Sequence, residues 1–252
     1  MVSKAVAKYV QALHLKKYRQ RYGAFLVEGG KSVQELLSSG LEVEHLLLTA
    51  EFAAQLGPVP AAAPPPVLVS EAELTQLSTL STNLTALAVA RRPPETPLPP
   101  TLCQTSLLLA LDAVADPGNL GTLLRLADWY GLPGVVVGTG CADPFSPKTI
   151  VASMGSFSRV AVWERDLAIW LAEVPTGSAV YGADLRGDNV HRTALAPAGV
   201  LVMGSESHGL TPAVAEHLTR RLHIPRSPLG QAESLNVAIS AGILLDNFFR
   251  EL

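Results

Sequence analysis

The strongest constraint on the fold is an alternation of short apolar runs with helix-forming stretches through the second part of the chain. The runs have the length of β-strands, and we expect strands at Ser106–Leu111, Gly134–Val137, Arg159–Val162, Ala179–Tyr181, Val200–Met203 and Leu222–Ile224. Strands that alternate with helices form a mostly parallel sheet whose two faces are covered by those helices. This part of the chain is therefore predicted to be an α/β domain.

Polar loops follow several of these strands. Open α/β sheets bind ligands in the crevice outside the carboxyl ends of their strands. The loops contain Gly204-Ser-Glu-Ser-His-Gly209, Ile224-Pro225 and Glu233-Ser-Leu-Asn-Val237, the last at the start of a helix predicted over Leu235–Phe249. These loops indicate a binding site rather than packing alone.

Another polar segment follows the first of these strands and leads into a helix predicted over Leu120–Tyr130. Asn119 is a suitable N-cap for this helix, and Gly131 stops it. Arg125 points away from the apolar stripe of the helix. An arginine in this place can hold an anion or a ribose-phosphate group.

The predicted last helix has apolar residues on two faces. Leu235, Ala238, Ile239 and Phe249 lie on one face, and Val237, Ala241, Leu244 and Phe248 lie on another. A helix with two apolar faces is buried by more than its own sheet. We expect the second face to pack against another subunit.

A proline-rich stretch divides the chain. Prolines cannot continue a helix or a central strand, so residues 93–101 are expected to form a stiff linker between domains at 1–92 and 102–252. The first domain is predicted to be a small α/β unit. Its expected helices are Lys4–Leu13, Lys31–Ser39 and Glu71–Leu77, and its expected strands are Ala24–Val27, Val43–Leu48 and Leu84–Ala90.

The net charge of −3 argues against a protein that coats nucleic acid by charge alone. The charge is unevenly distributed, however. Residues 1–31 contain one acid, Glu28, and the bases Lys4, Lys8, Lys16, Lys17, Arg19, Arg21 and Lys31. A local basic patch can contact phosphates in a chain that is mildly acidic overall, and the alternative is a solvated helix face.

The composition, with 48% apolar and 16% charged residues, is typical of a globular protein. No apolar run reaches the length of a membrane span, and the N-terminus lacks the apolar core of a signal peptide. Cys103 and Cys141 have neither metal-ligand spacing nor the pattern of a disulfide framework. We therefore expect a cytoplasmic protein without a metal ion or a membrane partner.

Taken together, the polar segments resemble the three signature motifs of the SpoU (TrmH) branch of the SPOUT RNA methyltransferases. The motifs are Asp116-Pro-Gly-Asn-Leu-Gly121 with Arg125, then Gly204–Gly209, then Ile224-Pro225 with Glu233–Val237. Ala152-Ser-Met-Gly-Ser156 with Arg159 resembles the family's segment between the first two motifs, and the similarity covers residues 104–252. Ser205 and Ser207 depart from the family, which commonly has asparagine and glycine there.

The first domain resembles the ribosomal-protein-like substrate-binding domain that many members of this family carry. Lys16-Lys-Tyr-Arg19 followed by Phe25-Leu-Val-Glu-Gly29 is similar to its opening. The stretch Ser78–Thr85 lacks the glycine often seen before the last strand of that domain.

The resemblance implies a C-terminal domain with a deep trefoil knot and an obligate homodimer. It also implies S-adenosylmethionine as the methyl donor and the 2′-hydroxyl of one ribose in ribosomal or transfer RNA as the acceptor. The two-domain layout favours large-subunit ribosomal RNA, by analogy only.

The family's site residues carry over position by position. The implied cofactor-binding residues are Gly204, Ile224 and Leu235, with Thr139 and Gly140 as additions, and the implied catalytic residues are Asn119, Arg125, Glu206, Ser234 and Asn236. Because a guanidinium is a poor base, Arg125 is expected to clamp an RNA phosphate and stabilise the forming alkoxide. Candidate RNA contacts are Lys16, Lys17, Arg19, Arg21, Lys148 and Arg226.

Two other functions are open to this sequence: a transfer-RNA ribose methyltransferase and a non-catalytic RNA-binding protein of the same fold. The joint presence of Asn119, Arg125, Glu206, Ser234 and Asn236 argues against the second. A nicotinamide-dependent dehydrogenase is excluded, because Gly118-Asn-Leu-Gly121 lacks the glycine spacing of a dinucleotide-binding loop.

Overall fold

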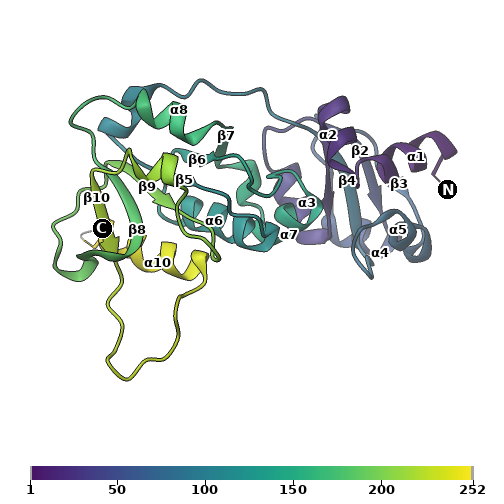
Figure 1. Cartoon of the computed structure of the whole chain (residues 1–252). Helices are drawn as coiled ribbons and strands as arrows, with labels where there is room; N and C mark the ends of the chain where they lie inside the picture. The colour runs from purple at the N-terminus through teal and green to yellow at the C-terminus, as the bar shows by residue number, and fades with distance from the viewer. Residues whose placement is uncertain (1, 251–252) are drawn as a thin grey trace. The chain divides into compact units, whose positions relative to one another are not determined.

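The computed structural model describes residues 2–250, which form two compact units (Figure 1). The first unit comprises Met1–Pro94 and Asp143–Arg159, and the second comprises Glu95–Ala142 and Val160–Leu252. None of the helices built from residues 2–250 combines the length and the apolarity that a membrane crossing requires.

The first unit is built on a four-stranded mixed sheet in the order β1-β4-β2-β3. The strands are β1 (Ala24–Glu28), β2 (Val43–Leu48), β3 (Val67–Leu68) and β4 (Ala86–Arg91). The helices that precede and connect them are α1 (Lys4–Ala12), α2 (Lys16–Tyr22), α3 (Gly30–Leu37), α4 (Ala50–Leu56) and α5 (Glu71–Leu77). Strand β4 runs antiparallel to both of its neighbours, so its two edges join β1 and β2.

Both faces of this sheet are apolar. Alternate residues of a strand point to opposite faces. On β1, Phe25 packs with Val33 and Leu36 of α3, and Leu26 packs with Val10 of α1 and Leu74 of α5. The predicted small α/β unit is thus present, with the helices α2 and α4 in addition to those expected.

The segment Asp143–Arg159, called here the inserted segment, belongs to the first unit. In the sequence, however, it falls between two strands of the second unit. It contains α7 (Pro147–Ser153) and a short 3₁₀ turn, η2 (Ser156–Ser158). The ring centroids of its Phe145 and Phe157 lie 5.1 and 6.0 Å from that of Phe25. The inserted segment therefore completes one side of the first unit's core, and the limits 1–92 and 102–252 stay a prediction.

A buried ion pair fixes this segment to α2. The Arg19 side chain is 5% exposed and that of Asp143 10%, and Arg19 Nη2 lies 2.6 Å from Asp143 Oδ2. Arg19 Nη1 also donates to the carbonyl oxygens of Leu13 and His14, at 2.8 and 2.9 Å. The prediction that Arg19 contacts RNA is therefore wrong, because its guanidinium is buried and bound to the protein itself.

The second unit is built on a parallel sheet of six strands in the order β10-β8-β9-β5-β6-β7. The strands are β5 (Leu107–Leu111), β6 (Gly134–Val137), β7 (Ala161–Glu164), β8 (Val180–Asn189), β9 (Gly199–Met203) and β10 (Arg220–His223). The helical elements are η1 (Pro100–Gln104), α6 (Pro117–Trp129), α8 (Leu167–Ala172), η3 (Val190–Arg192), α9 (Pro212–Ala215) and α10 (Val237–Phe248). The predicted α/β domain with a parallel sheet is confirmed, and the trefoil knot stays a prediction.

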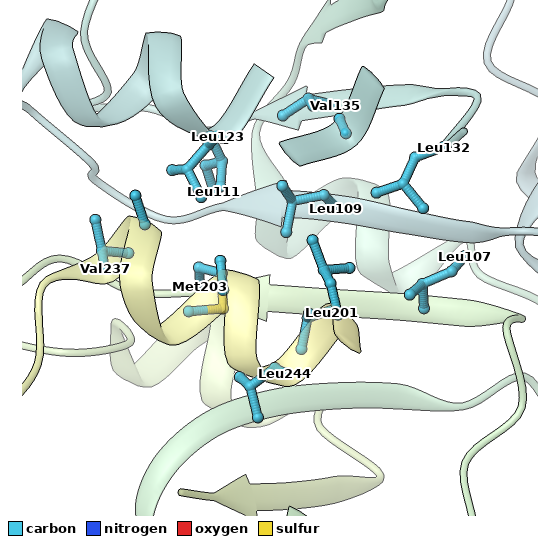
Figure 2. Packing of buried hydrophobic residues seen from close by; sticks show 14 of the residues in the cluster. Leu107, Leu109, Leu111, Leu123, Leu132, Val135, Leu201, Met203, Val237 and Leu244 are labelled. Atoms are coloured by element: carbon cyan, nitrogen blue, oxygen red, sulfur yellow. The ribbon is translucent and has the colours of Figure 1, made fainter. Parts of the chain in front are cut away.

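The central strands of this sheet are buried on both sides. On β5, Leu107, Leu109 and Leu111 pack with residues of α6 and α10, as Figure 2 shows for Leu123 and Leu244. The alternate residues Leu108 and Ala110 pack with residues of α8 and α9. Strand β8 is longer than predicted, because β10 pairs with it on both sides of a bulge between Arg221 and Leu222.

The inserted segment yields a prediction about stability. Asp143→Ala should lower the free energy of unfolding by about 3–5 kcal/mol, because it leaves the buried Arg19 guanidinium without its counter-ion. Urea unfolding followed by circular dichroism measures this. The control is Glu95→Gln in the Glu95–Arg165 pair, whose glutamate side chain is 60% exposed, with an expected loss below about 1 kcal/mol. Equal losses in the two variants would contradict a structural role for Arg19–Asp143.

Candidate active site

The first polar loop of the second unit ends in the N-terminus of α6. Asp116 is the N-cap, and its Oδ1 accepts a hydrogen bond of 2.9 Å from the backbone N–H of Asn119. Pro117 occupies the first helical position, where its fixed φ and missing N–H are tolerated. The prediction that Asn119 caps the helix is therefore wrong by three residues, and the Asn119 side chain is available for another role.

The Asn119 side chain joins the three polar loops. Its Nδ2 donates to Glu206 Oε1, and its Oδ1 accepts from Asn236 Nδ2 at 2.9 Å. Because an amide both donates and accepts, one side chain connects a carboxylate on one loop with an amide on another. Three of the predicted catalytic residues, far apart in the sequence, thus lie together.

Asn236 has two functions at the start of α10. Its Oδ1 accepts from the backbone N–H groups of Ala238 and Ile239, at 3.0 and 3.3 Å, while its Nδ2 reaches Asn119. The N-cap is therefore Asn236, and the helix predicted to start at Leu235 starts at Val237. Ser234 is exposed in the preceding loop and makes none of the hydrogen bonds that fix α10.

The loop that carries Glu206 is closed on itself. Ser205 and Gly209 exchange two backbone hydrogen bonds of 3.0 and 2.9 Å, and Ser205 Oγ accepts from the His208 N–H at 3.1 Å. A Cβ on Gly204 would lie 2.3 Å from the carbonyl carbon of Gly209, so only glycine fits there. Ser205, one of the departures from the family pattern, thus helps to close the turn.

A cavity of about 830 Å³ opens beside this loop, at the carboxyl ends of β9 and β10. Its walls include the apolar side chains of Met203, Leu222, Ile224, Leu235, Val237 and Leu244. Polar residues of the cavity include Glu206, Ser234 and Ser240. The volume lies within the usual range for small-molecule sites.

Of the predicted cofactor-binding residues, Gly204, Ile224 and Leu235 line this cavity. Thr139 and Gly140 do not line it; they are exposed in the loop after β6. That loop follows a different strand of the sheet, and its Gly140 lies next to Ala113. The second and third motifs therefore line the cavity together with residues of β8, β10 and α10.

Sequence reasoning missed the charged residues at the β8 side of the cavity. Asp184 Oδ2 lies 2.5 Å from Arg221 Nη1. The Arg186 backbone N–H and the Arg221 guanidinium both donate to the Asp184 carboxylate and hold its pKa below the usual value. The polar stretch Asp184–Asp188 gave no strand signal, so nothing in the sequence placed Asp184 beside the site.

The remaining predicted residues lie at the surface. Arg125 is exposed on α6, and within residues 2–250 it makes no hydrogen bond or ion pair. Arg226 lines the cavity and donates to the carbonyl oxygen of Ala232 in its own loop, at 2.9 Å. In the first unit, exposed positions are held by Lys16, Lys17 and Arg21 on α2 and by Lys148 on α7.

Two family models match this chain. The SpoU rRNA Methylase family matches residues 106–246, and the MRM3-like substrate binding domain matches residues 4–88. The 23S rRNA (guanosine(2553)-2'-O)-methyltransferase RlmP of Bacillus subtilis (strain 168) is 34% identical over 238 residues, which cover 92% of this chain and 91% of RlmP.

Solved structures agree with these matches. A TrmH-family protein from Porphyromonas gingivalis superposes with a TM-score of 0.88 at 39% identity, over 100% of both chains. The AdoMet-bound rRNA methyltransferase from Sinorhizobium meliloti superposes with a TM-score of 0.85 at 27% identity, over 100% of this chain and 97% of that one. The sequence motifs, the convergent loops and these similarities together establish that the chain belongs to the SpoU rRNA methylase family.

Proposed function

We propose that the protein transfers the methyl group of S-adenosylmethionine to a ribose 2′-hydroxyl of large-subunit ribosomal RNA. The observation that carries the proposal is the link from Asn119 to Glu206 and Asn236 beside the cavity, inside the matched family region. The similarity to a methyltransferase of 23S ribosomal RNA supports the choice of RNA.

The cavity residues fit S-adenosylmethionine, which supplies an electrophilic methyl group on a positively charged sulfur. Ile224, Leu235 and Leu244 offer apolar walls to the flat adenine ring. The carboxylate of Glu206 offsets positive charge in the cavity, while the hydroxyl groups of its serines can bind the polar end of the molecule.

Arg125 and Glu206 are assigned to the ribose. Methyl transfer joins the 2′-oxygen to the methyl carbon while the carbon–sulfur bond breaks, its electron pair stays on the sulfur of the released thioether, and the hydroxyl proton passes to water. Such an in-line displacement needs the oxygen at a fixed distance and direction from the methyl carbon. Glu206 accepts a hydrogen bond from the 2′-hydroxyl and thereby orients it. Arg125, which is permanently charged and unpaired among the described residues, binds an adjacent phosphate and stabilises negative charge that develops on the oxygen.

We also propose that the enzyme is located in the cytoplasm, where ribosomal RNA is found. Its chain is proposed to be knotted, as in its family. We assign no metal ion, because Arg125 supplies the positive charge at the reacting oxygen.

Loss of Arg125 tests the proposed reaction. Arg125→Ala should lower transfer of labelled methyl from the donor to total RNA by about 100-fold or more, because the developing charge loses its partner. Arg192→Ala, at another exposed arginine of the same unit, is the control and should transfer at the wild-type rate. Mass spectrometry should locate the label on a ribose of the large-subunit RNA. Label found only in transfer RNA would support the alternative substrate, and donor binding without transfer would support a non-catalytic RNA-binding protein.

Exchanging the polarity of two linked residues tests the role of Asn119. In Asn119→Asp, two carboxylates face each other, and kcat/KM should fall about 10- to 100-fold. Adding Glu206→Gln returns a donor opposite the new carboxylate and should recover part of the loss, while Glu206→Gln alone keeps an acceptor for Asn119. Initial rates of methyl transfer measure the series. A double variant no faster than Asn119→Asp would show that the hydrogen bonds do not position the site.

The exposed apolar residues of α6 and α10 support a homodimer. The expectation that the α10 face with Val237, Ala241, Leu244 and Phe248 meets another subunit is wrong, because these side chains are buried in the core of their own chain. On the other face Ile239 is 57% exposed, and Trp129 of α6, which packs against α10, is 83% exposed. We expect light scattering at micromolar concentration to give twice the chain mass of 26.6 kDa, and Ile239→Glu to give monomers. Ile169→Glu is the control, because Ile169 is 65% exposed on α8 of the opposite sheet face. A monomeric wild type would refute the dimer.

A further inference from the structure

One side of helix α2 carries two tyrosines and two cations, called here the α2 platform. Lys17, Arg21 and Tyr22 are exposed, and Tyr18 is half-buried. Arg19 is buried on the opposite side of the helix. Tyr18 and Tyr22 are one helical turn apart, which places neighbouring side chains together. Their ring centroids are 6.0 Å apart with an angle of 14° between the planes, so the rings are stacked.

Contacts with Tyr9, Glu44 and Arg91 hold the stacked rings in place. The Tyr9 ring meets Tyr22 edge-on, with centroids 5.2 Å apart, and the Tyr9 hydroxyl donates to Glu44 Oε2 at 2.7 Å. Glu44 Oε1 lies 2.5 Å from Arg91 Nε, and Arg91 Nη1 donates to the Tyr22 carbonyl oxygen at 2.9 Å. Burial and the Glu44 carboxylate raise the pKa of Tyr9, so its phenol remains the donor. The platform is therefore anchored to β2 and β4.

The charge on this surface has one sign. Lys17 Nζ lies 4.9 Å from the centroid of the Tyr18 ring, and Arg21 Cζ lies 5.7 Å from that of Tyr22. Helix α2 contains no acidic residue, and the nearby Glu44 carboxylate is already bound by Arg91 and Tyr9. Tyr22 is 37% exposed in spite of its aromatic ring. A ligand with flat aromatic groups and negative charges matches both properties.

We propose that the α2 platform binds an unpaired nucleotide of the RNA substrate, with the base stacked on the tyrosines and phosphates bound by Lys17 and Arg21. This inference rests on the proposed function, because it assumes an RNA substrate. A base that stacks on Tyr18 displaces the Lys17 ammonium from the ring toward the phosphate of the same strand. A cation–π contact is thereby exchanged for an ion pair.

The platform selects single strands over duplexes for a physical reason. Bases of an A-form duplex are stacked on one another and expose no face to a side chain, whereas unpaired bases stack freely on aromatic rings. Cations alone would bind the two forms through phosphate contacts. Preference for single strands therefore separates a stacking site from a simple basic patch.

Fluorescence anisotropy with the full-length protein tests the tyrosines. The probe is a labelled single-stranded RNA of about 12 nucleotides, compared with the same strand annealed to its complement. Tyr18→Leu and Tyr22→Leu should each weaken single-strand binding about 5- to 100-fold and leave duplex binding unchanged. Tyr22→Phe is the matched control, since it keeps the ring, and should bind within about twofold of the wild type.

The salt dependence tests the cations. The double variant Lys17→Gln, Arg21→Gln should reduce the slope of log affinity against log salt by about 1.4, which corresponds to two phosphate contacts on a single strand. Arg192→Gln in the second unit should leave the slope unchanged. An unchanged slope in the double variant would overturn the assignment of phosphates to Lys17 and Arg21.

A measurement on the wild type covers the case in which a leucine variant does not fold. Photo-crosslinking of a single-stranded RNA that contains 4-thiouridine should join the RNA to the peptide with Tyr18 and Tyr22. Crosslinks confined to other peptides would overturn the platform. Calorimetry of S-adenosylmethionine binding and assays of methyl transfer separate the α2 platform from the proposed function. If the wild type methylates RNA but the leucine variants bind RNA normally, the platform is refuted and the proposed function stands. If the crosslink forms but no methyl group is transferred, the proposed function is refuted and the platform stands.

Discussion

The second unit is governed by the burial of its parallel sheet on both faces. Leu107, Leu109 and Leu111 need one layer of helices and Leu108 and Ala110 need another, so polar groups are costly along the strands. Along the central strands β5, β6 and β9, polar side chains are therefore confined to the loops at the strand ends. In a parallel sheet these ends meet at one edge, and residues from distant parts of the sequence can hydrogen-bond there. The contacts of Asn119 with Glu206 and Asn236 are a product of that constraint.

The amide of Asn119 suits this place for a chemical reason. A carboxylate could accept from Asn236 but would repel Glu206, and a hydroxyl is too short to bridge two loops. The caps of the adjoining helices serve the same end. Asp116 takes over the capping of α6 and releases Asn119, while Asn236 uses its oxygen for α10 and its nitrogen for Asn119. Helix capping and site assembly are thus carried out by the same few side chains.

The sequence predicted features that depend on local pattern. The apolar runs around β5, β6 and β9 gave the parallel sheet, and the family motifs gave the convergent loops, both of which the structure contains. Features that depend on distant partners were missed. Helix α2 has no apolar stripe and is held by the buried Arg19, whose partner lies 124 residues away. The N-cap of α6 was predicted at Asn119 instead of Asp116, because both residue types are good caps. Only Pro117, which favours the first helical position, distinguishes them.

The inserted segment has a consequence for synthesis on the ribosome. Residues of the first unit that precede Pro94 leave the ribosome while Phe145, Ile150 and Phe157 have not yet been made. The apolar side of the sheet near Phe25 therefore stays open until β5, α6 and β6 have been translated. Completion of the first unit is coupled in time to the growth of the second, and a nascent chain stopped before Arg159 presents an uncovered apolar surface to chaperones.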